Sequence, residues 1–311
     1  MRIRREPEIQ VKTAQQIALM RAAGLVVARA LTAAAGAVGP GVSTADLDAV
    51  ADEEIRAAGA VPSFKGYHGF PATICASVNE EIVHGIPRAD RKLRSGDVVS
   101  IDCGAIVEGW HADAALTVGV GAISEELTRL IAACEQALWH GLAQARAGAR
   151  LSDISCAVER SARASASNSA SASNSASASN SASASNSASG GYGIVEDYVG
   201  HGIGSEMHMD PPVPNQGMPG QGPVLAEGMA LAIEPLLVLG RPDTVLLDDG
   251  WTVVSADGTW AAHFEHTVAI TADGPWVLTA PDGGRGWFSR LAEPTADSAG
   301  GLADSASRPQ V

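Results

Sequence analysis

Two aspartates, Asp102 and Asp113, stand eleven residues apart in the strand-like stretch VVSIDCGAIVEGWHADAALTV. A hairpin that turns at Glu108-Gly109 would place Asp102 opposite Ala115 and make Asp113 its diagonal neighbour on the same face. Diagonal neighbours have Cα atoms about 7–8 Å apart, and two carboxylates this close repel each other unless a cation lies between them. The alternative for this segment alone is a pair of solvent-facing acids on an edge hairpin.

The second half of the chain offers further ligand types in apolar surroundings. His201 lies in YVGHGIGSEMHMDPP, Glu234 in GMALAIEPLLVL and Glu265 in AAHFEHTVAI. A buried, unpaired carboxylate costs several kcal/mol and needs a metal, an arginine or a proton, and no matching arginine lies nearby. Two Asp, two Glu and one His carry four negative charges, which balance two divalent cations. This oxygen-rich set suits manganese, ferrous iron or cobalt and predicts a dinuclear site.

The elements that must position these residues follow the order two helices, strands, two helices, strands, which predicts an α+β fold built from a duplicated unit. Thr13, Thr44, Ser124 and Ser152 are the expected helix N-caps. The expected helices cover residues 13–38, 44–59, 124–146 and 152–163, and the expected strand-rich blocks cover residues 61–120 and 192–278.

Three segments stand outside this order. The Ser/Ala/Asn hexamer repeat at residues 164–191 has neither charge nor large apolar side chains, so we expect a flexible loop whose first turn can extend the preceding helix. Residues 1–12 read as an N-terminal arm, and residues 281–311 read as a mostly disordered tail.

Composition narrows the functional classes. The formal charge of −14 disfavours a nucleic-acid or anionic-membrane partner. No apolar run is expected to span a bilayer, because Arg21 and Arg29 interrupt the most apolar helix, and the basic N-terminus lacks the apolar core of a secretory signal. Four scattered cysteines fit a reducing cytosol. We therefore expect a cytoplasmic protein.

Five motifs, taken in order, give the chain a family resemblance: GYHGFPATICASVNEEIVHGIP, SIDCGAIVEGWHADAA, GHGIGSEMHMDPP, LAIEPLL and HFEHTVAI. The chain resembles the type I methionine aminopeptidases of metallopeptidase family M24, and in particular the actinobacterial enzymes among them. The resemblance implies a pita-bread fold, in which two pseudo-symmetric α/β halves surround a curved antiparallel sheet. It also implies a single catalytic domain at residues 13–280, and it assigns the metal ligands to Asp102, Asp113, His201, Glu234 and Glu265.

The resemblance further implies a mechanism. A water that bridges the two metals attacks the scissile amide, with Glu234 as general base, while His84 and His208 contact the substrate and steady the tetrahedral intermediate. His263 and His266 flank a ligand, and one of them is expected to orient a carboxylate. The pocket for the methionine side chain would be lined by Phe64, Tyr67, Phe70, Cys75, Met207 and Trp251.

The implied substrate is the N-terminus of a nascent polypeptide, met at the ribosome, whose methionine is removed when the second residue is small. The implied cofactors are two divalent ions (Co, Mn, Fe(II) or Zn) and one monovalent cation (Na or K) near Asn79, in a monomeric enzyme. Two alternatives remain open. One is an Xaa-Pro aminopeptidase of the same fold, for whose large N-terminal domain the chain leaves no room. The other is a pita-bread protein that binds partners without catalysis.

Overall fold

A long antiparallel hairpin, β4 (Val98–Val107) and β5 (Trp110–Gly119), contributes the two longest strands of the largest sheet. The hairpin turns at Glu108-Gly109, where both residues have positive φ, and it pairs Asp102 with Ala115. The predicted register is therefore confirmed. The computed structural model describes residues 9–173 and 191–293, so the predictions for residues 1–8, 174–190 and 294–311 lie outside the described residues.

The hairpin belongs to a nine-stranded sheet in which neighbouring strands pair antiparallel. Its order is β1-β4-β5-β14-β9-β7-β8, with β2 also paired to β4 and β15 to β14. Two three-stranded sheets, β13-β10-β6 and β11-β12-β3, complete the described strands. The remaining strands are β1 (Val61–Pro62), β2 (Ile74–Val78), β3 (Glu81–Val83), β6 (Gly193–Ile194), β7 (Gly200–Gly202), β8 (Met209–Val213), β9 (Ala230–Ile233), β10 (Leu236–Val238), β11 (Thr244–Leu246), β12 (Val253–Ser255), β13 (Ala261–His263), β14 (Glu265–Thr271) and β15 (Gly274–Val277).

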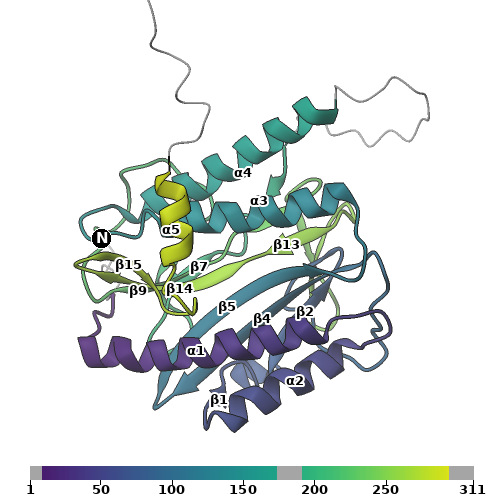
Figure 1. The fold of residues 1–311 in the computed structure, drawn as a ribbon, viewed down its shortest axis with the longest axis horizontal. Coiled ribbons are helices and arrows are strands. Elements are labelled where there is room, and N and C mark those ends of the chain that lie inside the picture. Colours follow the sequence, from purple (N-terminus) through teal and green to yellow (C-terminus); the bar gives the residue numbers. More distant parts are fainter. Residues whose placement is uncertain (1–8, 174–190, 294–311) are drawn as a thin grey trace, which may run out of the picture.

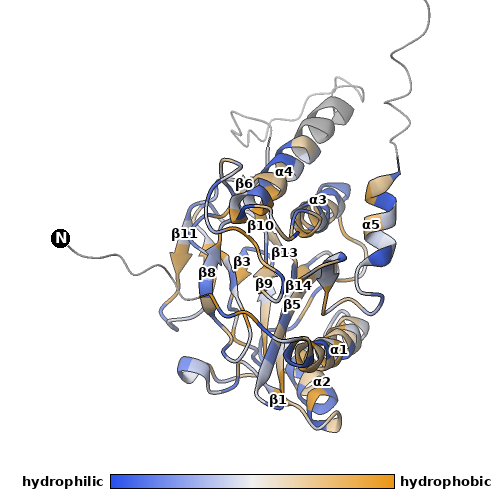
Figure 2. Ribbon diagram, turned by 90° about the vertical axis from the view of Figure 1, so that its left-hand side faces the viewer, coloured by the Kyte–Doolittle hydropathy of each residue, from blue (hydrophilic) through white to orange (hydrophobic). Residues whose placement is uncertain are grey.

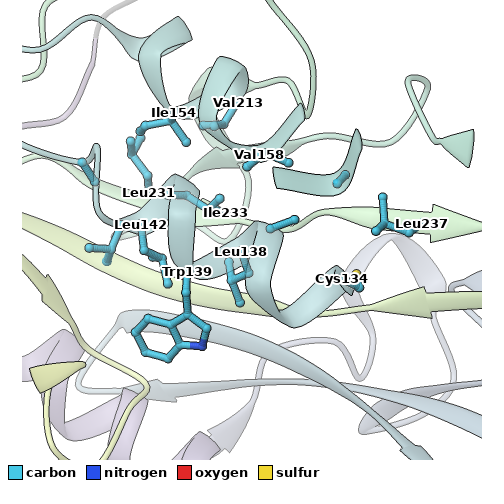
Figure 3. Close-up of a cluster of buried hydrophobic side chains, with 14 of the residues drawn as sticks. Cys134, Leu138, Trp139, Leu142, Ile154, Val158, Val213, Leu231, Ile233 and Leu237 are labelled. Atoms are coloured by element: carbon cyan, nitrogen blue, oxygen red, sulfur yellow. The ribbon is translucent and has the colours of Figure 1, made fainter. Parts of the chain in front are cut away.

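Two helix pairs cover the strands, as the predicted order of elements requires (Figure 1). The pairs are α1 (Ala14–Ala37) with α2 (Thr44–Ala57), and α3 (Glu125–Leu142) with α4 (Leu151–Ser173). In the turned view of Figure 2, α1, α2 and α3 lie on the same side of the strands. Each pair buries its own core: Leu47, Ile55 and Ile101 belong to the first, and Leu138 and Ile233 to the second (Figure 3). Burial of this apolar surface is the main stabilising contribution on both halves.

Two of the four predicted caps are wrong. Thr13 and Ser124 cap α1 and α3 as predicted. For α2, however, the cap is Ser43, which exchanges hydrogen bonds with Asp46 in a capping box, while the Thr44 hydroxyl bonds to the backbone of Arg88 instead.

The fourth helix is also longer than predicted. It begins at Leu151 and runs to Ser173, so residues 164–173 of the repeat are helical rather than a loop. Ser152 lies inside the helix, and its hydroxyl donates to the carbonyl of Gln221 instead of capping. Alanine has the highest intrinsic helix propensity, which is consistent with the extension of α4 into the repeat.

A fifth helix contradicts part of the predicted disordered tail. Residues 285–292 form α5 (Arg285–Ala292), which packs beside α3 (Figure 1). Trp287 stacks on Trp139 of α3 with ring centroids 5.3 Å apart, and Phe288 meets the same indole edge-on. These aromatic contacts fix a segment that has little local signal for order.

Helix α1 contradicts the expectation about membrane spans. Residues 14–36 are long and apolar enough to cross a bilayer by length and composition. The helix packs on the first core through Ala23, Val27 and Ala30, which are fully buried there. This packing accounts for its apolar character.

Gly24 allows α1 to approach the chain after β15, because a Cβ at this position would overlap the carbonyl of Leu278. We predict that Gly24→Ala lowers the free energy of unfolding by about 1–3 kcal/mol, as overpacking does elsewhere. The matched control is Gly36→Ala on the same helix, where nothing lies within 4 Å of the added Cβ. That variant should be neutral or more stable by up to about 1 kcal/mol. Chemical denaturation of both variants measures the difference, and equal stabilities would contradict the prediction.

Candidate metal centre

Three neighbouring strands place three carboxylates on one face of the sheet. Asp102 on β4 pairs with Ala115 on β5, and Ala115 pairs in turn with Glu265 on β14. Asp113 lies two residues before Ala115 on β5, so its side chain projects from the same face. The Thr267 hydroxyl accepts from the Asp113 N–H (2.9 Å) and donates to the Asp113 carbonyl (2.8 Å), which ties β5 to β14. The small Ala115 side chain leaves the space between the acids open.

The second half contributes a histidine and a fourth acid. His201 on β7 pairs with Ala232 on β9, and Glu234 follows directly after β9. His201 Nε2 lies 3.6 Å from Glu234 Oε1. Its Nδ1 lies 3.0 Å from the Gly202 carbonyl, so Nδ1 carries the proton and Nε2 keeps its lone pair for a metal. Asn215 donates its side-chain amide to the Glu234 carbonyl and holds the backbone there.

The carboxylates are buried beyond what protein hydrogen bonds can compensate. Asp102 Oδ1, Asp113 Oδ1 and Glu265 Oε1 are buried and have no hydrogen-bond partner. Burial, together with the neighbouring carboxylates, raises the pKa of Asp102, Glu234 and Glu265 well above the ordinary range. Burial raises the pKa of Asp113 to about 7.

Such a set of partnerless oxygens needs positive charge. Two triads have ligand atoms within 4.8 Å of one another, namely Asp113 with His201 and Glu265, and Glu234 with His263 and Glu265. The residues therefore fit divalent metal ions in their number, charge and donor type.

One cavity of about 90 Å³ adjoins these ligands. All thirteen side chains that the sequence analysis assigned to the site line it: Phe64, Tyr67, Phe70, Cys75, His84, Asp102, Asp113, His201, Met207, His208, Glu234, Trp251 and Glu265. Residues from both halves of the chain are thus brought to one place. The volume suits a single side chain rather than a folded segment.

The two non-ligand histidines approach the cavity from different elements. His208 Nδ1 pairs with the Tyr67 hydroxyl at 2.8 Å, and its ring lies 4.3 Å from that of His201 between centroids. His84 follows β3 with a positive φ of 59°. Burial lowers the pKa of His84 to about 4 and also lowers that of His208, so both imidazoles are neutral near pH 7.

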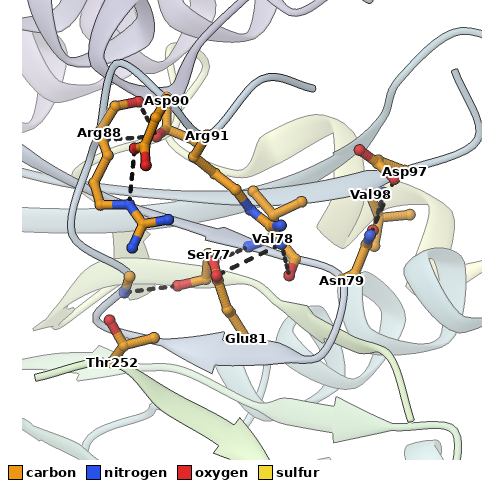
Figure 4. A network of polar contacts seen from close by, with 12 residues as sticks. Ser77, Val78, Asn79, Glu81, Arg88, Asp90, Arg91, Asp97, Val98 and Thr252 are labelled. Carbon is orange, nitrogen blue, oxygen red and sulfur yellow. Dashed lines mark hydrogen bonds and ion pairs between the residues drawn. The ribbon is translucent and has the colours of Figure 1, made fainter. Parts of the chain in front are cut away.

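A polar network supports the segment that carries His84 (Figure 4). The Gly85 N–H donates to the Ser77 hydroxyl, and Arg91 bridges the Val78 carbonyl and Glu81. Asn79, the residue expected near a monovalent cation, uses its side chain to join Asp97 and Val98, and its carbonyl accepts from the Ala261 N–H. The described contacts of Asn79 are therefore structural.

Part of the cavity wall is apolar. Phe64, Phe70, Cys75 and Met207 are buried, and Trp251 meets Phe70 edge-on with centroids 5.1 Å apart. Cys75 pairs with Asp102 across β2 and β4, and burial, then the nearby Asp102 charge, raises the pKa of its thiol. The wall thus suits a long, uncharged and polarisable side chain.

His263 is a fourteenth residue at the site. Its side chain is 1% exposed, and its Nε2 lies 3.8 Å from Glu234 Oε2. Burial lowers the pKa of His263 to about 3. Its place two residues before Glu265 is the signal in the sequence, but the sequence does not decide whether His263 or His266 orients a carboxylate. His266 instead pairs with Thr279 and contacts Trp139, away from the carboxylates.

Comparison with known proteins decides the family. The sequence model of metallopeptidase family M24 matches residues 18–272. The chain belongs to metallopeptidase family M24. Methionine aminopeptidase 1 of Mycobacterium tuberculosis is 49% identical over 278 residues, which cover 89% of this chain and 97% of the relative. Methionine aminopeptidase of Clostridium acetobutylicum is 46% identical over 271 residues, which cover 87% and 98%.

Solved structures agree with this placement in the family. The methionine aminopeptidase of Thermotoga maritima has a TM-score of 0.77 and 37% identity, covering 88% of this chain and 99% of that one. The match to the prolidase of Pyrococcus furiosus covers 87% of this chain and 65% of the prolidase, with 21% identity and a TM-score of 0.64. At this identity the match shows a shared fold alone. The resemblance to type I methionine aminopeptidases and the pita-bread fold are therefore confirmed. The chain is a metal-dependent aminopeptidase by these comparisons.

Metal removal should make stability depend on pH in a defined direction. Folding raises the pKa of the Asp113 carboxyl from 3.8 to about 7. Relative to the unfolded chain, the folded protein is therefore more stable while this carboxyl is protonated than after it ionises. That contribution is lost as the pH rises through the folded value, because the folded state then binds more protons than the unfolded one. His201 and His263 have the opposite effect, because burial lowers their pKa from 6.5 to about 3. They make stability rise with pH between about 3 and 6.5, and above about pH 6.5 they cause no further change.

We therefore predict that metal-stripped protein loses stability as the pH rises from about 6.5 through 7, where Asp113 still ionises in the folded state and the histidines no longer offset the loss. Saturating Mn(II) or Co(II) should abolish this loss and, at 100 times the dissociation constant, add about 2.7 kcal/mol. Thermal melts across this pH range, with chelator or with metal, measure both effects. Stability that stays flat for the metal-stripped protein would contradict the raised carboxyl pKa values.

Proposed function

We propose that this protein removes the N-terminal methionine from newly made proteins when the second residue is small. The supporting observation is the juxtaposition of a small apolar pocket with a cluster of four buried carboxylates and a histidine. The apolar end accepts one uncharged side chain, while the ligand end accepts the free amino group and the first peptide bond. The names of the similar proteins from Mycobacterium tuberculosis and Clostridium acetobutylicum support the same reaction.

The proposed ligands are Asp102, Asp113, His201, Glu234 and Glu265. When bound there, divalent cations supply the Lewis acidity that makes water a nucleophile near neutral pH. Glu234 is the proposed general base, which takes the proton of the attacking water and returns it to the leaving amine. Its side chain is 13% exposed, so it meets the cavity without full solvation. A base of this kind contributes roughly 10²–10⁴-fold to the rate.

His84 and His208 are the proposed substrate-contacting residues. Both are neutral and line the cavity, so each can donate one N–H to the scissile amide as negative charge develops on its oxygen. The Tyr67 hydroxyl fixes the ring orientation of His208. Phe64, Tyr67, Phe70, Cys75, Met207 and Trp251 are the proposed methionine pocket.

We extend the proposal to the setting of the enzyme. Its metals are two ions of cobalt, manganese, ferrous iron or zinc, and its place is the cytoplasm, at the ribosome, as a monomer. Residues 13–280 are the proposed catalytic domain. A sodium or potassium ion near Asn79 would have to share the carbonyl that already accepts from Ala261.

Peptide hydrolysis discriminates between this function and its alternatives. Metal-stripped protein is assayed on Met-Ala-Ser and Ala-Pro-Ser, with Mn, Fe(II), Co or Zn added back in turn. Release of methionine alone supports the proposal, whereas release of alanine from the proline peptide indicates the Xaa-Pro class. A folded, metal-loaded protein without turnover would indicate a binding protein.

Replacement of the general base gives a specific prediction. Glu234→Gln should lower kcat on Met-Ala-Ser by about 10²–10⁴-fold, because the amide cannot accept the proton. Glu126→Gln, an exposed acid on α3, is the control and should retain full activity. Metal analysis of both variants separates a lost base from a lost ligand. Full activity in Glu234→Gln would refute the assigned role.

The two histidines give a second prediction for turnover. His84→Ala and His208→Ala should each lower kcat by about 10²–10³-fold, the usual cost of removing one donor to a developing oxyanion. The metal content should stay unchanged, because neither side chain is a proposed ligand. His140→Ala, on the exposed side of α3, is the matched control. Loss of metal in either variant would instead place that histidine among the ligands.

A further inference from the structure

His263 presents a buried ring nitrogen to the catalytic carboxylate without a hydrogen bond. Its Nε2 has no hydrogen-bond partner among the described residues, and the side chain is 1% exposed. Around this nitrogen lie Glu234, with Oε2 at 3.8 Å, and Glu265, and the His84 ring interacts electrostatically with His263. A buried polar atom with no partner in a native structure calls for an explanation.

The backbone of His263 is held unusually firmly. The Thr117 hydroxyl accepts from the His263 N–H at 2.9 Å and donates to the His263 carbonyl at 2.8 Å. β13 also pairs His263 with Leu236, two residues after Glu234. The Cys134 thiol of α3 contacts the carbonyls of Pro235 and Ala262, the residues adjacent to Glu234 and His263. One buried thiol thus links the two backbone segments that carry this pair.

We propose that His263 is a positioning residue, whose Nε2–H donates a hydrogen bond to Oε2 of Glu234 and holds this carboxylate for proton transfer. The proposal rests on the function proposed above for Glu234. The gap of 3.8 Å between Nε2 and Oε2 exceeds a hydrogen bond by less than 1 Å, so a small side-chain rotation closes it.

The two oxygens of Glu234 face different imidazoles, and this asymmetry favours a donor over a ligand. Oε1 faces His201, whose Nε2 lone pair is free because its Nδ1 bonds to Gly202. A metal held by His201 would therefore lie on the Oε1 side, and the alternative triad of Glu234, His263 and Glu265 is the ligand reading that the experiments below test. On the other side, a lone pair of His263 would repel Oε2, whereas an N–H would stabilise it. The four carboxylates already balance two divalent charges, so the cluster lacks a donor rather than another ligand.

The tautomer of His263 tests the proposal directly. Long-range proton–nitrogen NMR of ¹⁵N-histidine-labelled, Zn(II)-loaded protein reports which ring nitrogen carries the proton, and the His263→Gln spectrum assigns the signal. We expect protonation at Nε2. Protonation at Nδ1, with Nε2 bound to zinc, would overturn the proposal and make His263 a ligand. This result does not depend on turnover, so it stays distinct from a failure of the proposed function on Met-Ala-Ser.

Two substitutions separate a hydrogen-bond donor from packing. His263→Leu removes the donor and should lower kcat by about 10–100-fold, with KM nearly unchanged. His263→Gln retains an N–H donor and should restore most of kcat. Both variants should still bind two Co(II) per chain with the absorption spectrum of the wild type. His266→Gln, at a partly buried histidine that contacts Thr279 instead, is the control for loss of a neighbouring imidazole.

Each other outcome overturns the proposal. Loss of one Co(II) in both His263 variants would indicate a metal ligand. Full activity in His263→Leu would show that Glu234 needs no support from this side. Equal loss in His263→Gln, His263→Leu and His266→Gln, with lowered melting temperatures, would indicate a structural role alone.

Discussion

Four carboxylates share one buried cavity, and this concentration of negative charge is the constraint on which the rest of the structure depends. Without compensation the acids would repel each other or take up protons, as the raised pKa of Asp113 indicates. Among the described residues no arginine lines the cavity, so the strands hold the acids in place and the compensating charge has to come from bound cations. The row Asp102–Ala115–Glu265 uses strand pairing itself to fix the spacing of the acids. Metal binding is therefore coupled to stability as well as to catalysis.

Rigid placement of the acids depends on the two cores behind the strands. Helices α1 and α2 hold the hairpin that carries Asp102 and Asp113, and α3 supports the strands next to Glu234 and His263. Residues 164–173 prolong α4 beyond the turns that supply Ile154 and Val158 to the second core (Figure 3).

The sequence predicted those features that depend on local pattern. Alternation and the Glu-Gly turn gave the register of Asp102 and Asp113, and lone acids in apolar strands marked Glu234 and Glu265. It failed where a distant contact decides between local options. Thr44 is a favourable N-cap residue by type, but its hydroxyl donates to the carbonyl of Arg88 instead. Helix α5 is ordered by the stacking of its Trp287 on Trp139. The function of each pocket residue came from the family resemblance, because periodicity cannot specify methionine.

Three histidines near the carboxylates differ in the contacts that hold them in place. His201 donates from Nδ1 to a backbone carbonyl, which leaves a lone pair for a metal. His208 shares Nδ1 with the Tyr67 hydroxyl and turns its other nitrogen to the cavity. His263 is anchored through its backbone by Thr117, so its ring is free to serve Glu234. The sequence contains eight histidines, and it does not show which contacts orient each ring. Those contacts determine which ring nitrogen can bind a metal or donate a hydrogen bond.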